Sequence, residues 1–117
     1  MSERADIDFL SDIKEAILRI NTYAKDLGYE QFLQDKKTQD AVIRNLEIIG
    51  EAAKNISGGL KEKNPQMFWK DLAGLRDKLI HHYFGVNFDI VWKIVKEELP
   101  QVLSQLEEIL KNEHKVQ

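Results

Sequence analysis

The chain contains no cysteine among its 117 residues. It therefore has no disulfide bonds, no thiolate metal site and no cysteine nucleophile. Proline and glycine are also scarce, with two and six residues respectively, which argues against a loop-rich or all-β chain. No apolar run approaches the length of a membrane span, and the first six residues contain no apolar signal core. We therefore expect a cytoplasmic protein with no membrane partner.

The length and the net charge of the chain further narrow the class of protein and its partners. A chain of 117 residues suits one domain with one core, so we expect a single helical domain over residues 1–117. Seventeen lysine and arginine residues against 20 aspartate and glutamate residues give a net charge of −3. A non-specific nucleic-acid binder is usually basic. We accordingly expect no DNA partner.

Apolar residues recur at steps of three and four along four stretches, which is the spacing of amphipathic helices. The predicted helices cover about residues 7–27, 38–56, 65–84 and 88–111, with a short helical turn at 29–34 and a frayed end at 112–117. No alternating pattern typical of β-strands interrupts them. The predicted fold is all-α, an antiparallel bundle of four main helices plus short helical turns.

Several residues mark the expected helix ends. Thr38 is a candidate cap for the second helix, and Ser57-Gly58-Gly59 should end it. Asn64-Pro65 is a typical helix start. Asn87 should cap the last helix, which we expect to kink at Pro100, where proline removes a backbone donor. Gly50 lies inside the apolar arc of the second helix, so another helix should approach closely there.

The densest group of reactive side chains is Arg76-Asp77-Lys78-Leu79-Ile80-His81-His82-Tyr83. At 100° per residue, Arg76 falls within an apolar arc of the predicted fourth helix, and His81 falls on another side. An arginine on such a face is a structural ion-pair partner, extends to solvent, or faces another protein. His81 and His82 are equally compatible with two surface histidines.

Other catalytic sites fit the sequence poorly. A zinc-binding helix needs two histidines at i and i+4 with a third ligand, and adjacent His81 and His82 lack that spacing. There is no Gly-x-Ser-x-Gly nucleophile motif and no glycine-rich phosphate loop. We expect no metal site and no cofactor.

Arginine and histidine without a nucleophile suit RNA cleavage, because RNA carries its own nucleophile in the 2′-hydroxyl. Histidine can move protons near neutral pH, and the planar guanidinium matches phosphate oxygens. One helix does not place Arg76 and His81 on the same face. A two-fold dimer could bring them together by apposing the two motif helices.

The same residues carry a family resemblance. Arg76 through Tyr83 resembles the Arg-x-x-x-x-His-x-Tyr motif of the HepT toxins, a branch of the HEPN superfamily of helical ribonucleases. The segments 44–53, with its Ile49-Gly50-Glu51, and 91–100, from Val91-Trp92 to Leu99-Pro100, are also similar to typical segments of that family. The resemblance covers most of the chain.

The resemblance implies a helical homodimer with both motif helices at the interface and a metal-independent endoribonuclease, with tRNA among its candidate substrates. It also implies a toxin neutralised by an MNT-type nucleotidyltransferase antitoxin that transfers AMP to the motif tyrosine. Residue by residue, Arg76 and His81 would be catalytic, Tyr83 the modification site, and Asp77 and His82 supporting residues. Asp77 departs from the pattern, because relatives often carry Asn or another polar residue there.

Two alternatives remain at this stage. The chain could be a non-catalytic helical subunit that presents substrate to, or regulates, a nucleotidyltransferase; family members of that kind typically lack the Arg/His pair. Tyr83 could be only an aromatic residue at the edge of the core whose hydroxyl reaches water.

Overall fold

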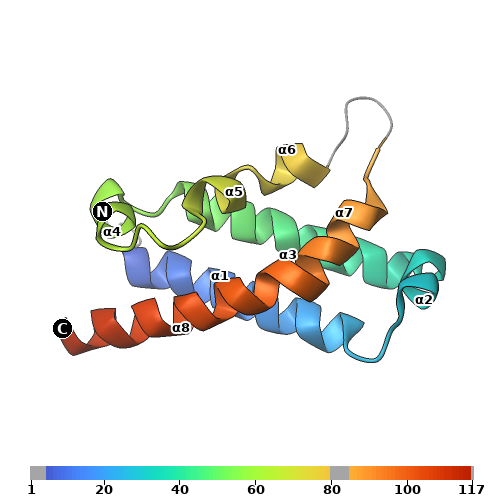
Figure 1. Ribbon diagram of the computed structural model, residues 1–117, viewed down its shortest axis with the longest axis horizontal. Helices are drawn as coiled ribbons and strands as arrows, with labels where there is room; N and C mark the ends of the chain where they lie inside the picture. Colours follow the sequence, from blue (N-terminus) through green and yellow to red (C-terminus); the bar gives the residue numbers. More distant parts are fainter. Residues whose placement is uncertain (1–4, 80–84, 117) are drawn as a thin grey trace.

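The computed structural model describes residues 5–79 and 85–116 of the chain (Figure 1). Every element in these two ranges is helical, which confirms the predicted all-α class. The motif residues His81, His82 and Tyr83 lie outside the described residues. None of the described helices has the length and apolar character needed to cross a membrane.

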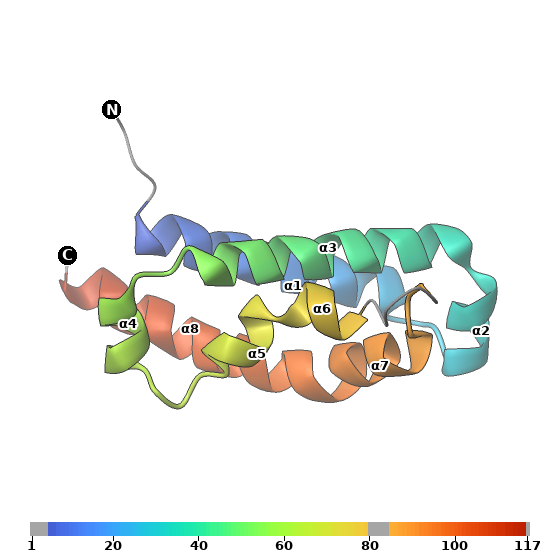
Figure 2. The ribbon, with the colours of Figure 1, turned by 90° about the horizontal axis from the view of Figure 1, so that it is seen from above.

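Two long antiparallel helices form one side of the molecule (Figure 2). They are α1 (Asp6–Ala24) and α3 (Lys36–Lys54). The cap of α3 is Asp35, whose carboxylate accepts hydrogen bonds from the Thr38 backbone N–H at 3.0 Å and from its hydroxyl at 2.6 Å. The prediction of Thr38 as the cap was therefore wrong. Thr38 is the donor, because aspartate three positions earlier supplies the acceptor.

The short helix α2 (Tyr29–Gln34) connects them and confirms the predicted turn at 29–34. Phe32, fully buried in this helix, lies 5.1 Å from the Trp92 ring and 5.9 Å from the Phe88 ring between centroids. The Lys96 ammonium lies 4.7 Å from the centre of the Trp92 ring and donates to the Ala24 carbonyl at the end of α1. These contacts close one end of the bundle.

The stretch after α3 differs from the prediction. Ser57 follows the end of α3 and also starts the next helix. Its hydroxyl accepts a hydrogen bond from the Leu60 N–H and caps α4 (Gly58–Lys63). Asn64-Pro65 does not start a helix: the Asn64 backbone N–H donates to the last carbonyls of α4. The helical path resumes as α5 (Trp69–Ala73) and α6 (Leu75–Leu79), separated at Gly74.

The C-terminal helix is continuous through Pro100. It consists of α7 (Phe88–Lys93), a π-helical turn η1 (Ile94–Glu98) and α8 (Leu99–Val116). Asn87 caps it as predicted, through its side-chain oxygen and the N–H groups of Asp89 and Ile90. The kink expected at Pro100 stays a prediction. The turn before it is a π turn, in which the Leu99 N–H donates to the Ile94 carbonyl. Helix α8 extends to Val116, beyond the end expected at residue 111. The fraying expected after that residue stays a prediction.

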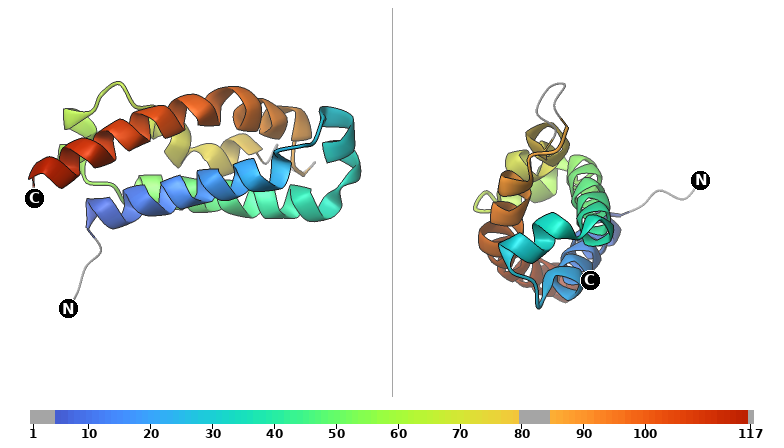
Figure 3. Two further views of the ribbon diagram at one scale, coloured as in Figure 1. Left: turned by 90° about the horizontal axis from the view of Figure 1, so that it is seen from below. Right: turned by 90° about the vertical axis from the view of Figure 1, so that its right-hand side faces the viewer.

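The long helices surround a common interior, and α2 lies across one end (Figure 3). Leucine and isoleucine dominate this core, and the largest fully buried side chains include Leu10, Ile17, Leu46, Ile49 and Leu106. The backbone of α5 approaches α3 closely at Gly50. A Cβ atom there would lie 3.2 Å from the Leu72 carbonyl oxygen. The close approach predicted at Gly50 is confirmed, and it fixes α5 and α6 against α3.

Candidate functional site

Arg76 is on the outside of α6, not in the core. Its neighbours Leu75 and Leu79 are buried, with 3% and 1% of their surfaces exposed, and anchor α6 to the bundle. Arg76 itself is exposed. The expected position of Arg76 within an apolar arc was wrong, because Leu75 and Leu79 face the core while Arg76 faces outward.

Arg76 lies at the edge of an open hollow of about 360 Å³ on the surface formed by α1, α3, α5 and α6. The lining residues come from all four helices and are mostly polar: Phe9, Asp12, Arg44, Glu47, Ile48, Gly50, Glu51, Ala52, Lys54, Asn55, Ala73 and Arg76. The hollow exists because Gly50 and Ala73 leave little side-chain volume between α3 and α5.

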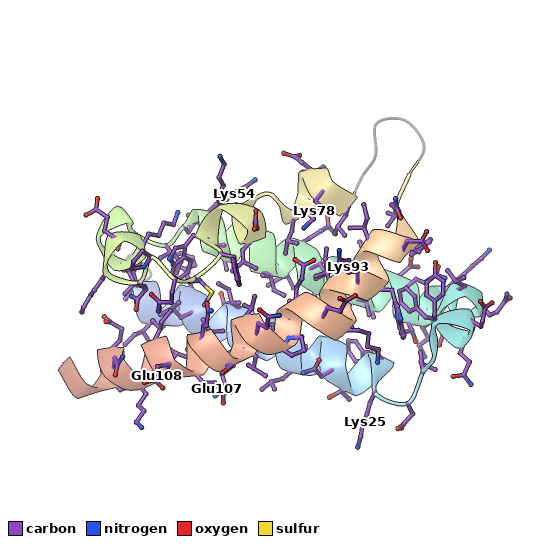
Figure 4. All side chains as sticks on the ribbon, in the orientation of Figure 1. Lys25, Lys54, Lys78, Lys93, Glu107 and Glu108 are labelled. Carbon is purple, nitrogen blue, oxygen red and sulfur yellow. The ribbon has the colours of Figure 1, made fainter. Side chains whose placement is uncertain are left out.

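The charges in this hollow balance. Three cations, Arg44, Lys54 and Arg76, face three anions, Asp12, Glu47 and Glu51. Figure 4 shows Lys54 of this group on α3, next to α5. Sequence reasoning did not select the α3 charges, because the helix was interpreted through its apolar residues. The signal was present, since Arg44, Glu47 and Glu51 follow the three- and four-residue spacing of one helix face.

Arg76 forms no ion pair within 4 Å with any described residue. The neighbouring Lys78, in contrast, lies 3.6 Å from the Glu98 carboxylate of η1. If Arg76 were a structural ion-pair partner, a carboxylate would lie within 4 Å of its guanidinium. Residues 5–79 and 85–116 place none there. Asp77 is exposed. Arg76 is therefore available to bind an anion or a second protein.

The chain on the two sides of residues 80–84 is held together. The Asn87 backbone N–H donates to the Leu79 carbonyl at 3.1 Å. Gly85, with φ of 83°, has a backbone conformation that favours glycine. Within the described residues, no three His, Asp or Glu side chains gather closely enough to hold a metal ion.

Comparison with known proteins supports the family resemblance. The model of the family described as Ribonuclease HepT-like matches residues 13–109. The chain belongs to this family. No solved structure matches the chain.

The relatives extend over nearly the whole chain. A protein of Methanocaldococcus jannaschii with a provisional RNase name is 51% identical over 104 residues, covering 89% of this chain and 86% of its own length. A probable ribonuclease HepT of Thermococcus cleftensis is 49% identical over 109 residues, covering 93% and 99%. A provisionally named RNase of Caldanaerobacter subterraneus subsp. tengcongensis is 46% identical over 89 residues, covering 76% and 80%.

Proposed function

We propose that this protein is a metal-independent endoribonuclease, the toxin of a toxin–antitoxin pair. Its place among the HepT-like ribonucleases and the ribonuclease names of its relatives support the activity. The observation that carries the assignment to Arg76 is that its guanidinium is exposed beside a hollow and has no ion-pair partner among the described residues.

In the proposed reaction the 2′-hydroxyl of RNA attacks the adjacent phosphorus. The 2′-oxygen–phosphorus bond forms and the bond to the 5′-oxygen breaks, so the products carry a 2′,3′-cyclic phosphate and a 5′-hydroxyl. A neutral His81 imidazole accepts the 2′-hydroxyl proton, and a protonated His81 of the partner subunit gives one to the leaving oxygen. Arg76 stabilises the negative charge that develops on the phosphate oxygens.

Control of the enzyme is assigned to Tyr83. A nucleotidyltransferase partner would transfer AMP from ATP to the phenol oxygen, with pyrophosphate leaving and the phenol proton passing to solvent. The added phosphodiester anion could pair with Arg76, as phosphorylated tyrosine pairs with arginine in other proteins. Modified protein would then lose both RNA binding and cleavage.

The test is incubation of the purified protein with total RNA in the presence of a chelator, followed by analysis of the new ends. We expect cleavage with cyclic phosphate and 5′-hydroxyl ends at the rate seen without chelator. Activity that a chelator abolishes and a divalent ion restores would contradict the metal-independent mechanism. Intact RNA, combined with stable binding to the nucleotidyltransferase, would favour the alternative of a non-catalytic subunit.

A further inference from the structure

A second pocket lies where α5 and α6 run beside the C-terminal helix (Figure 2), whereas the hollow at Arg76 lies between α5, α6 and the first two long helices. Its volume is about 190 Å³. Five buried side chains, none more than 4% exposed, form its apolar lining: Leu72, Leu75, Ile94, Leu99 and Val102. The pocket shares no lining residue with the hollow. A molecule bound in it therefore leaves the Arg76 hollow unoccupied.

An exposed aromatic ring borders this pocket. Phe68 is one of three large apolar side chains that are exposed in the described part of the chain, with 44% of its surface accessible. Its neighbours Met67 and Trp69 are buried. Aromatic side chains are enriched in the centres of protein interfaces. The described residues leave the Phe68 ring uncovered beside an apolar pocket, so a partner that fills the pocket can also cover the ring.

The polar side chains that line the pocket include two carboxylates and no cation. They are Asp71, Glu98 and the amide of Gln101. Glu98 lies 3.6 Å from the Lys78 ammonium, which balances its charge. Asp71 is exposed and forms no ion pair within 4 Å with any described residue. The uncompensated carboxylate selects a partner that carries lysine or arginine next to an apolar side chain.

The size of the pocket favours one side chain of a protein over a whole small molecule. Small-molecule sites usually have volumes of roughly 300–1,000 Å³, which is more than the 190 Å³ found here. Carboxylates at the edge also disfavour RNA, because phosphates select an excess of cations. One apolar anchor in a pocket, surrounded by complementary charge, is instead the usual form of the strongest contact between two proteins.

The wall that the C-terminal helix contributes is irregular. Ile94 and Glu98 are the first and last residues of the π turn η1, and both line the pocket together with the Leu99 that follows. Single π turns within α-helices are frequent at functional sites. The irregular turn therefore lies at the pocket itself, where it supplies both an apolar side chain and a carboxylate.

The pocket is built from the two helices that flank the proposed modification site. Helix α6, which contributes Leu75, ends at Leu79, immediately before residues 80–84. The π turn η1 continues the helix that begins at Phe88, shortly after those residues. A protein that transfers AMP to Tyr83 has to contact the chain next to these two helices. Its docking segment can therefore reach this pocket.

We infer that this pocket is the docking site of the nucleotidyltransferase, which inserts one apolar side chain between α5 and η1 and places a lysine or arginine next to Asp71. The inference rests on the proposed function, in which that enzyme modifies Tyr83. It adds the contact surface and the chemistry of the partner's docking segment. Because the pocket is separate from the hollow at Arg76, the partner can dock without occupying the proposed catalytic site.

Two surface substitutions test the inference by isothermal titration calorimetry of the full chain with the purified nucleotidyltransferase of the same toxin–antitoxin pair, without ATP. Asp71→Lys and Phe68→Ala should each raise the Kd by at least about tenfold, the scale of an important interface contact. The wild-type Kd should also rise with ionic strength, and Asp71→Lys should lose part of that dependence. Both positions are exposed, so the melting temperature and RNA cleavage should match the wild type.

The matched controls are Glu108→Lys, an exposed carboxylate on α8 (Figure 4), and Tyr23→Ala, an exposed aromatic on α1. Neither residue lines the pocket, so both variants should bind like the wild type. An unchanged Kd for either Asp71→Lys or Phe68→Ala would overturn the inference, as would equal losses in the controls. A pocket variant that weakens self-association in sedimentation equilibrium would assign the pocket to a second copy and overturn it too.

RNA cleavage is assayed separately, so that the two proposals fail independently. Binding that responds to the pocket variants while RNA stays intact would support the docking site and refute the ribonuclease proposal. RNA cleavage by a wild-type chain that does not bind the nucleotidyltransferase would overturn the docking site and leave the ribonuclease proposal standing.

Discussion

Arg76 combines two properties that the sequence alone did not reveal together: a fixed backbone and a free side chain. Leu75 and Leu79 on either side are almost fully buried and hold α6 in place. The arginine between them is exposed and has no ion-pair partner among the described residues. A substitution at Arg76 should therefore change chemistry without changing stability.

We expect Arg76→Ala to lower the rate of RNA cleavage by roughly 10²- to 10³-fold, the usual effect of removing one group that stabilises transition-state charge. Arg76→Lys should recover only part of the loss, because the ammonium group lacks the planar fork. The melting temperature should stay the same. Lys70→Ala, which removes an exposed cation on α5, is the control and should cleave normally.

His81 should be the proton-transfer group, so His81→Ala should cost at least about 10²-fold in rate. His82→Ala should have a much smaller effect. A larger loss for His82→Ala would show that the catalytic imidazole had been assigned to the wrong residue. The comparison is made by single-turnover cleavage of one RNA, which excludes differences in product release.

Tyr83 should gain the mass of AMP when the protein is co-expressed with its nucleotidyltransferase, as intact-protein mass spectrometry would show. The Tyr83→Phe variant should lack the added mass and remain toxic in the presence of the partner, because it has no phenol oxygen to accept AMP. A Tyr83→Phe protein that is still neutralised by AMP transfer would place the modification elsewhere.

The helices themselves show which parts of the fold can be read from sequence. The short helix at 29–34, the Asn87 cap and the close approach at Gly50 were predicted correctly, because each depends on residues adjacent in the chain or on a missing side chain. The break at Gly74 was not, since Leu72, Leu75 and Leu79 keep helical spacing across it. Leu72 before the break and Leu75 and Leu79 after it are all buried, whereas Arg76 is exposed.

Gly50 gives a prediction for the contact between α3 and α5. Gly50→Val should lower the free energy of unfolding by about 1–3 kcal/mol, the usual cost of overpacking. Its Cβ would sit 3.2 Å from the Leu72 carbonyl oxygen, and a backbone atom cannot rotate away. Gly58→Val, where a Cβ meets nothing within 4 Å, should change the stability much less. Urea denaturation of both variants measures the difference.

Asp35 gives α3 a stability that depends on pH. The Thr38 hydroxyl and then the Thr38 N–H, both donating to the carboxylate, lower the pKa of Asp35 below its ordinary value of 3.8. A lowered pKa means that the folded state favours the ionised form, so the contribution is complete above pH 3.8 and is lost as the pH falls through the folded value.

Asp35→Ala should therefore have a lower melting temperature than the wild type at pH 7, and the gap should narrow as the pH falls below 3.8. Asp26→Ala, which removes an exposed carboxylate in the turn after α1, is the control. A gap for Asp35→Ala that is constant from pH 7 to strongly acidic pH would contradict a role for the ionised cap.

In the molecule as a whole, Arg76 and the charged residues of α3 line one hollow, and the sequence indicated only Arg76. The motif from Arg76 to Tyr83 is local, so a chain pattern identifies it. The charged residues of α3 in this hollow lie about 30 residues earlier in the sequence, and they come next to Arg76 where α5 packs closely against α3 at Gly50. The described structure supplied that juxtaposition.

The chain enters α1 and leaves α8 at the same end of the molecule, beside α4 (Figure 1). The Ser57 N–H and hydroxyl bind the Asp6 carboxylate, and Lys63 binds Glu113, so both ends are tied to the α4 region. The two ends of the described chain therefore lie on the same side of the bundle. A linker that joins them in a circular permutant should not have to cross the molecule, so new ends placed in the turn between α1 and α2 should leave the bundle folded.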